Sequence, residues 1–329
     1  MAAVVSCVSA MAEEPNRAGD FVFLKHKPCL HRAAFAEDEG LCSRNTGLIV
    51  FARAALDRDV KHARLQNGLE LPYVEQGDQS GVPVLLLHGY ADSWHFWEPL
   101  LPLLPSTIHC FAISERGHGD AGKPRSGYRL EDFSEDAVRF IDSVGLERAV
   151  VVGHSSGGYI ARRVALDHPD RLLGLMLIGS PLSLHQRRTT FTEAVNNLRD
   201  PVDPTFIEEF LDVFPLFGPV PRSLLDATRT EMAKMPARVW QATLRGLTEA
   251  DPPDSRAISV PTVVVWGDRD EFLARSEQEA LAAAISGSRF VAYEGAGHLV
   301  LWDAPERIAA DLVALTRTIT AVIRPMSAE

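Results

Sequence analysis

The sequence predicts an α/β fold in which a mostly parallel central sheet is flanked by helices and carries an inserted helical cap. Three observations predict it. The chain has 329 residues, enough for one large α/β domain with a sizeable core. From about residue 61 onward, apolar β-rich runs alternate with helical patterns, which is typical of crossover connections between parallel strands. Between Pro181 and Val260 this alternation stops and only helical spacing is found.

Seven apolar runs are predicted as strands. They cover, in chain order, residues 70–77, 82–89, 107–114, 148–155, 172–181, 261–268 and 288–297. The run VPVLLLHG at 82–89 is continuous rather than alternating, which is typical of a strand buried on both faces. Helical patterns lie between and after these strands, at residues 131–145, 158–169, 276–286 and 304–323.

The long interruption holds helical patterns, several of them opened by Asp or Pro. They cover residues 191–199, 203–214, 221–235 and 237–250. We therefore predict a helical cap over 182–257, inserted into a core formed by 61–181 and 258–329. Residues 1–60 show no clear period and are interpreted as an N-terminal extension, partly disordered or loosely packed. Within it, segment 48–56 fits a short helix or a short strand equally well.

Composition and charge narrow the classes of function. Hydrophobic residues make up 46% of the chain and charged residues 23%, as in an ordinary soluble globular protein. The net charge of −11 disfavours nucleic acid or an anionic membrane as a partner, and no apolar run approaches the length of a membrane span. The four cysteines lack the close-paired spacing of a zinc site or disulfide framework; they are Cys7, Cys29, Cys42 and Cys110.

These features predict a small-molecule substrate and no membrane or nucleic-acid partner. The N-terminus lacks the basic region of a secretory signal, so we expect a cytoplasmic protein. Neither the oligomeric state nor processing of the N-terminus follows from the sequence.

A short pattern near the middle of the chain predicts the chemistry. Gly153-His154-Ser155-Ser156-Gly157 fits G-x-S-x-G, directly after a predicted strand and at the start of a predicted helix. A serine on such a sharp turn is held in a strained backbone conformation, so its neighbours two residues away must be small. The turn also aims the backbone N–H of Ser156 at the same space. We predict Ser155 as a nucleophile.

A serine hydroxyl needs a base to remove its proton and an acid to orient that base. His298 follows the last predicted strand and is the one histidine after Asp270. Asp268 and Asp270 both follow the preceding strand. Asp268 comes directly after the strand glycine and is expected to brace the turn, whereas Asp270 lies further into the loop and can reach the histidine. The chain order Ser155, Asp270, His298 is that of one known hydrolase architecture.

Stabilising the oxyanion requires hydrogen-bond donors close to the nucleophile. His88-Gly89 ends the strand at 82–89 and lets the backbone turn back toward Ser155. We therefore predict that the backbone N–H of Tyr90 pairs with that of Ser156 as an oxyanion hole. His88 itself is interpreted as structural, because it precedes the triad order and lies in a strand-end turn.

These residues resemble the α/β-hydrolase superfamily, and its capped serine hydrolases of the esterase and C–C hydrolase branch in particular. The motifs HGYADS, RGHGDAGKP, GHSSGG, WGDRDEF and GAGHLVLWDAPE occur in the order of the family, over about residues 61–323. The resemblance implies a nucleophile at Ser155, an acid at Asp270 and a base at His298. It also implies oxyanion N–H groups at Tyr90 and Ser156, and neither a metal nor an organic cofactor.

The chain departs from its relatives in two places. Ser114 and Ala121 stand where related loops often carry aspartate and serine, which affects the local hydrogen bonding of that loop. Relatives that open epoxides or displace halides carry an aspartate nucleophile, and Ser155 stands in its place. The resemblance therefore argues against both of those chemistries.

The predicted function is hydrolysis of a small, largely apolar carboxylic ester or lactone through an acyl-enzyme. Aromatic residues near the motifs and in the cap are predicted to line the substrate pocket: Trp94, Phe214, Phe217, Phe272 and Trp302. Hydrolysis of a C–C bond in ring-cleavage products stays open, because such relatives share the triad and the cap. A lyase, which would use a cap lysine such as Lys234, and a binding receptor on the same fold also stay open.

Overall fold

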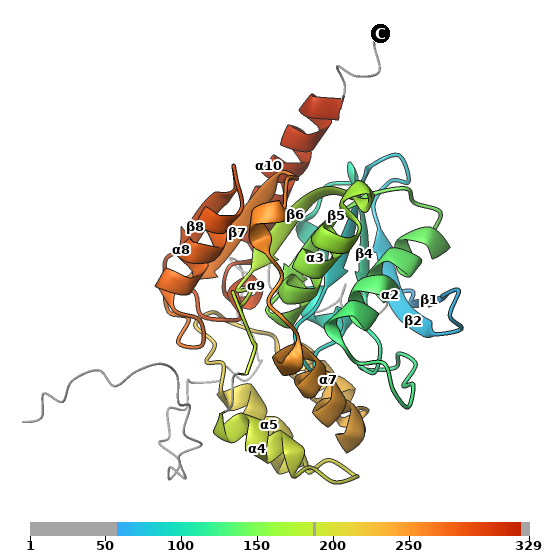
Figure 1. The fold of residues 1–329 in the computed structure, drawn as a ribbon, viewed down its shortest axis with the longest axis vertical. Helices are drawn as coiled ribbons and strands as arrows, with labels where there is room; N and C mark the ends of the chain where they lie inside the picture. The colour runs from blue at the N-terminus through green and yellow to red at the C-terminus, as the bar shows by residue number, and fades with distance from the viewer. Residues whose placement is uncertain (1–57, 187–188, 324–329) are drawn as a thin grey trace, which may run out of the picture.

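The structure is a computed structural model that describes residues 58–186 and 189–323 (Figure 1). Most of the predicted N-terminal extension, including segment 48–56, lies outside the described residues. The centre is an eight-stranded sheet with the order β1-β2-β4-β3-β5-β6-β7-β8. The strands are β1 (Lys61–Arg64), β2 (Glu70–Gln76), β3 (Val82–Leu87), β4 (Ile108–Ile113), β5 (Ala149–His154), β6 (Leu172–Ile178), β7 (Thr262–Gly267) and β8 (Arg289–Tyr293).

The predicted fold class is confirmed: β3 to β8 pair in parallel, and β1 and β2 form an antiparallel edge. Each predicted strand contains an observed one. β1 was not predicted. It has the sequence KHAR, and only Ala63 of its four residues is buried, so it carries no apolar run that could signal a strand.

The sheet is buried on both faces. Along β3, Leu85 and Leu87 point into one apolar cluster, whereas Val84 and Leu86 point into another. The first cluster lies under α2 (Leu130–Ser143), α3 (Ser156–Asp167) and α8 (Arg275–Ala284). The second lies under η1 (Trp94–Trp97), η2 (Leu101–Leu103), α9 (Val300–Asp303) and α10 (Pro305–Ile323). This two-faced burial explains why the strand sequences read as continuous apolar runs.

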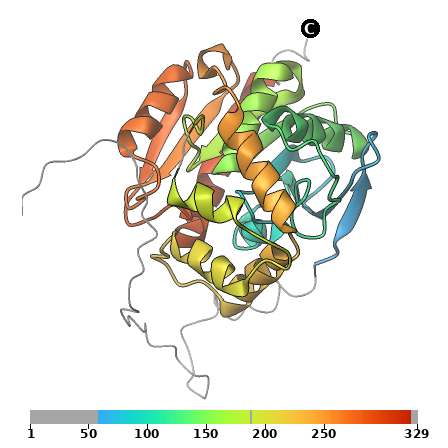
Figure 2. The same cartoon turned by 60° about the horizontal axis from the view of Figure 1, so that its bottom comes forward.

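Four helices between β6 and β7 lie over the end of the sheet at which the parallel strands terminate (Figure 2). They are α4 (Thr190–Asn196), α5 (Pro204–Asp212), α6 (Arg222–Ala233) and α7 (Ala237–Glu249). Asp203 begins α5 because its side chain accepts the backbone N–H of Thr205 at 2.8 Å, next to a proline at the first helical position. We call these four helices the cap.

A buried arginine fastens both ends of the cap to α3. The guanidinium of Arg162 donates to the carbonyl oxygens of Pro181 and Leu182, where the cap begins, at 2.8 and 3.1 Å. It also donates to the carbonyl of Pro253 and the hydroxyl of Ser255, where the cap ends, at 2.7 and 2.9 Å. All these acceptors are neutral, and burial lowers the pKa of Arg162 to about 10.

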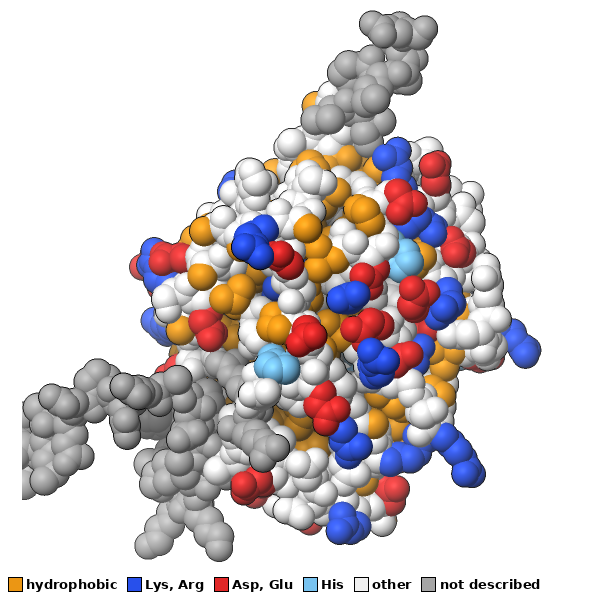
Figure 3. Space-filling view, viewed as in Figure 1, with side chains coloured by type: hydrophobic (Ala, Val, Ile, Leu, Met, Phe, Trp, Pro, Cys, Tyr) orange, Lys and Arg blue, Asp and Glu red, His pale blue; other side chains and the backbone are white. Residues whose placement is uncertain are grey.

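On the face shown in Figure 3, acidic and basic side chains are interspersed rather than gathered into a patch of one sign. Within residues 58–186 and 189–323, no helix is both long enough and apolar enough to cross a bilayer. Short 3-10 turns at η3 (Pro169–Arg171) and η4 (Ser255–Ala257) complete the connections.

Candidate active site

Ser155 lies on the tight turn between β5 and α3, with φ +51° and ψ −120°. A positive φ is strained for a residue with a side chain. The turn requires glycine on either side. A Cβ on Gly153 would lie 2.3 Å from the carbonyl oxygen of Gly157, and one on Gly157 would lie 2.3 Å from that of Leu87. Close backbone packing therefore fixes where the Ser155 side chain projects.

A continuous chain of hydrogen bonds joins the three side chains that the sequence singles out. His298 Nε2 lies 3.0 Å from Ser155 Oγ, and His298 Nδ1 lies 2.9 Å from Asp270 Oδ2. A carboxylate only accepts, so Nδ1 carries the proton and Nε2 is left to accept the proton of the serine hydroxyl. His298 and Asp270 are both buried. The arrangement can deprotonate a hydroxyl that attacks a carbonyl carbon.

The two candidate acids have different surroundings. The second oxygen of Asp270 accepts the backbone N–H groups of Phe272 and Leu273 at 2.8 and 2.9 Å, so the carboxylate is held with one oxygen toward the imidazole. Asp268 instead accepts the N–H of Gly295 at 2.7 Å. Asp268 thus joins the two loops after β7 and β8, whereas Asp270 is the one in contact with His298.

Aromatic rings from the cap and from the sheet loops enclose the His298 imidazole. Phe214 stacks on it with ring centres 4.9 Å apart, and Phe272 meets it edge-on at 5.0 Å. His154 donates from Nε2 to the backbone carbonyl of His298 at 3.0 Å. Burial, with a smaller contribution from the neighbouring His298, lowers the pKa of His154 to about 3, so His154 stays neutral.

The two residues predicted to form the oxyanion hole, Tyr90 and Ser156, both line the cavity that Ser155 lines. Ser156 is the first residue of α3, and the first N–H groups of a helix have no partner within it. Tyr90 follows β3, and both residues line the same cavity. The Tyr90 ring turns away into the cap, where its hydroxyl donates to the carbonyl of Trp240 at 2.8 Å. The role of these N–H groups as an oxyanion hole stays a prediction.

A cavity of about 570 Å³ lies between the cap and the carboxyl ends of the strands. Ser155 and His298 line it together with three of the predicted pocket residues, Phe214, Phe272 and Trp302. Its apolar wall also includes Leu184, Phe191, Phe210, Leu211, Val213, Met232, Leu244, Leu247 and Leu299. The volume suits a small molecule.

Trp94 and Phe217 do not line this cavity, so including them in the pocket was wrong. Trp94 begins η1, and its buried ring stacks on His95 within the cluster beneath α10. Phe217 is 39% exposed and lies over the guanidinium of Arg269 at 5.1 Å. Both residues were predicted to line the pocket because they lie near the motifs in sequence. The local turns instead direct their rings away from the cavity.

The charged side chains that line the cavity are acidic. They are Asp92, Glu209 and Asp212, and none of the described lining residues is lysine or arginine. Glu209 and Asp212 are exposed at the cap surface, whereas Asp92 is buried. Burial raises the pKa of Asp92 to about 7, and the Ser93 N–H opposes that rise.

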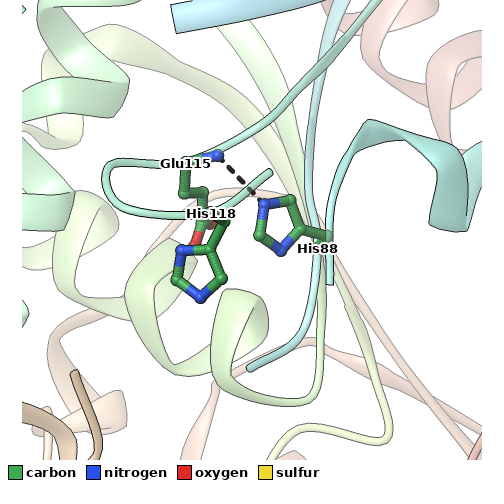
Figure 4. Close-up of side chains that lie close together, drawn as sticks. All are labelled: His88, Glu115 and His118. Atoms are coloured by element: carbon green, nitrogen blue, oxygen red, sulfur yellow. Dashed lines mark hydrogen bonds between the residues drawn. The ribbon is translucent and has the colours of Figure 1, made fainter. Parts of the chain in front are cut away.

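A second cluster of ionisable groups lies beside β3 (Figure 4). Donor atoms of His88, Glu115 and His118 lie within 4.8 Å of one another. His88 has no free ring nitrogen, because Nε2 accepts the N–H of Glu115 and Nδ1 then donates to the carbonyl of Gly89. Burial raises the pKa of Glu115 well above its usual range and lowers that of His118 to about 4, which favours neutral forms. The cluster is therefore better suited to bracing the Gly89 turn than to holding a metal ion.

Sequence analysis missed two residues that shape the site, Asp303 and Thr228. Asp303 accepts the N–H groups of Phe217 and Gly218 through one oxygen and that of Gly297 through the other, so it joins the cap to the His298 loop. Thr228 on α6 lines the cavity. Asp303 lies within the GAGHLVLWDAPE motif, five residues after His298, which is a signal that could have found it. Thr228 follows no motif, because the cap helices give no comparable signal.

Comparisons with known proteins agree with this architecture. Residues 82–218 match the protein family described as the alpha/beta hydrolase fold. Epoxide hydrolase B of Mycobacterium tuberculosis is 39% identical over 109 residues, 32% of this chain and 31% of that relative. This chain thus spans about a third of the length of that relative. Monoacylglycerol lipase abhd6-B of Xenopus laevis is 26% identical over 282 residues, 78% of this chain and 82% of that relative.

Solved structures give the same result. A thermophilic esterase from Thermogutta terrifontis superposes with a TM-score of 0.67 at 25% identity, covering 79% of this chain and 99% of the esterase. A lipase-like structure from Acinetobacter baumannii gives a TM-score of 0.72 at 20% identity, over 87% of this chain and 99% of the other. The names of these proteins cover several activities, so similarity alone does not select a substrate.

Proposed function

We propose that this chain, which belongs to the α/β-hydrolase superfamily, is a serine hydrolase that cleaves a small, largely apolar carboxylic ester or lactone. One observation carries the proposal. The hydrogen-bonded series from Ser155 Oγ through His298 to Asp270 opens onto a cap-covered cavity. An intracellular location and a small-molecule substrate stay predictions from the sequence.

The proposed reaction begins when His298 Nε2 takes the hydroxyl proton of Ser155 as the oxygen attacks the carbonyl carbon. Asp270 holds the imidazole in the required tautomer and stabilises the imidazolium. The N–H groups of Tyr90 and Ser156 would bind the oxyanion, and His298 then gives the proton to the departing alkoxide. Water, activated by the same histidine, hydrolyses the acyl-enzyme and frees Ser155.

A serine nucleophile favours acyl transfer over epoxide opening, although several similar proteins are named epoxide hydrolases. Attack of a serine oxygen on an epoxide carbon would form an alkyl ether, which has no carbonyl for water to attack. A carboxylate nucleophile forms an ester, which water can hydrolyse. With Ser155 in this position, an ester or lactone substrate regenerates the free enzyme and an epoxide does not.

The charges of the cavity favour an ester over the alternative C–C bond substrate. A ring-cleavage product that carries a carboxylate would meet Asp92, Glu209 and Asp212, with no described lysine or arginine on the lining. The lyase alternative is also disfavoured, because Lys234 Nζ is bound to Asp120 and Glu231, each at 2.6 Å, and Lys234 is absent from the lining.

The direct test is turnover of a chromogenic short-chain ester by the wild type and by Ser155→Ala. We expect repeated turnover by the wild type and a loss of about 10⁴-fold or more in the variant, because its nucleophile is gone. The thermal unfolding temperature should stay nearly unchanged, since the change removes one atom that lines the cavity. Equal turnover by both proteins would contradict the proposal, and a single burst without turnover would indicate a receptor.

A further inference from the structure

Asp92 lines the cavity from the loop that follows β3. Its backbone N–H donates to the carbonyl of Gly89 at 3.2 Å, and its Oδ1 accepts the N–H of Ser93 at 3.1 Å. The side chain is only 7% exposed and faces the cavity. Among the described residues no lysine, arginine or histidine forms an ion pair with it. Asp92 is therefore a buried carboxyl group without a counterion.

The electrostatic surroundings make this position costly for a negative charge. Burial, with a smaller contribution from Glu231 on α6, raises the pKa of Asp92 to about 7. Glu231 has its own partner, because Lys234 Nζ lies 2.6 Å from its Oε1. Asp92 has no such partner, although it forms part of a cavity wall. A bound cation would compensate its charge.

A second polar group on the cavity wall also lacks a partner. Thr228 on α6 is 1% exposed and lines the cavity. Its Oγ1 has no hydrogen-bond partner among the described residues. The helix that carries it packs against η1, which begins two residues after Asp92. A buried hydroxyl is ordinarily hydrogen-bonded, so an unpartnered one on a cavity wall points to a ligand.

The remaining wall suits a positive charge as well. Phe210 and Trp302 also line the cavity, and aromatic faces attract ammonium groups within about 6 Å. Such rings bind the hydrocarbon part of a substrate and tolerate a cation next to it. An anionic substrate would gain nothing from them and would be repelled by Asp92.

We propose that Asp92 is the counterion for an ammonium group of the bound molecule, and that Thr228 Oγ1 accepts one of the N–H bonds of that group. The cavity would then select an ester or lactone that carries a primary amine. This substrate class rests on the proposed hydrolase function. The subsite itself would bind an ammonium group whether or not the protein cleaves the molecule that carries it.

The experiment compares two molecules of nearly equal shape, benzylammonium and benzyl alcohol, by calorimetric titration. We expect the wild type to bind the cation about tenfold more tightly than the alcohol, because the charge is compensated in a buried site. Asp92→Asn retains the shape and the Ser93 hydrogen bond, and should bring the ratio close to one. Thr228→Val should weaken benzylammonium binding about threefold, because one hydrogen bond is lost.

Glu209→Gln is the matched control, since it removes one acid from the exposed rim of the same cavity. Solvent screens that charge, so the ratio should change less than about twofold. A wild type that does not discriminate, or an Asp92→Asn variant that retains the preference, would overturn the inference. The titration also works with Ser155→Ala. A protein that binds benzylammonium through Asp92 but hydrolyses no ester would refute the proposed function and leave the subsite in place.

Discussion

The turn that carries Ser155 and the cavity above it are built in contrasting ways. The turn is made of backbone in such close contact that a single added carbon on Gly157 would lie 2.3 Å from the carbonyl of Leu87. The cavity wall is made of side chains from the cap and the loops, and two of its polar groups, on Asp92 and Thr228, have no side-chain partner among the described residues. The first region fixes a geometry for chemistry, whereas the second leaves interactions for a ligand to complete.

The largest effect should come from the acid that contacts His298. Asp270→Asn keeps the shape of the side chain but allows the imidazole to take the wrong tautomer, so kcat should fall about 10⁴-fold. Asp268→Asn is the control, because Asp268 binds the Gly295 N–H and not the imidazole. Steady-state hydrolysis of a chromogenic ester measures both. If Asp268→Asn were the more damaging, the acid would be wrongly assigned.

The rigidity of the turn can be tested with an added methyl group. Gly157→Ala should lower the free energy of unfolding by about 3 kcal/mol, because the new carbon collides with backbone that cannot move aside. Gly145→Ala is the matched change in open space, where only the positive φ of +72° is unfavourable, and it should cost about 1 kcal/mol. Urea unfolding gives both values. Equal losses in the two variants would show that the turn is not tightly packed.

A further effect, which depends on pH, concerns the charge of Asp92. Its pKa is raised from 3.8 to about 7 in the folded protein, so the folded state binds the proton more tightly than the unfolded chain. The contribution of Asp92 to the free energy of unfolding should therefore be largest below about pH 4. It should fall by on the order of 4 kcal/mol as the pH rises toward 7. Glu231 on α6 is the charged group that adds to the rise, and the Ser93 N–H opposes it.

Asp92→Asn removes this titration. The variant should gain unfolding free energy relative to the wild type at pH 8 and gain little at pH 4.5, as measured by urea unfolding at both pH values. Glu209→Gln, at the exposed rim, should show no such pH-dependent difference. A constant difference between wild type and Asp92→Asn at both pH values would contradict a buried, uncompensated carboxyl group.

The contrast between the two regions also explains how much the sequence predicts. The turn is encoded locally, because G-x-S-x-G must follow a strand and begin a helix. Asp270 and His298 likewise follow strand ends, which a parallel sheet brings to one edge. The sequence therefore predicts the fold class, the identity of the three side chains and the presence of helices between β6 and β7.

The cavity depends on which way cap side chains face, and that is set by long-range packing rather than by spacing. Trp94 and Phe217 lie beside motifs, yet one is buried in the core and the other lies at the surface. Thr228 carries no motif and still lines the cavity. The edge strand β1 was missed for a related reason, since pairing with β2 rather than its own apolar pattern makes it a strand.

The central claim is that Ser155 is a nucleophile activated by His298, and covalent labelling tests it most directly. The wild type is incubated with a fluorophosphonate probe, digested, and the modified peptide is located by mass spectrometry. We expect a single adduct on Ser155, formed at least about 10³-fold more slowly in His298→Ala because the base is missing. Absence of an adduct, or an adduct on another serine that forms at the same rate in both proteins, would contradict the account.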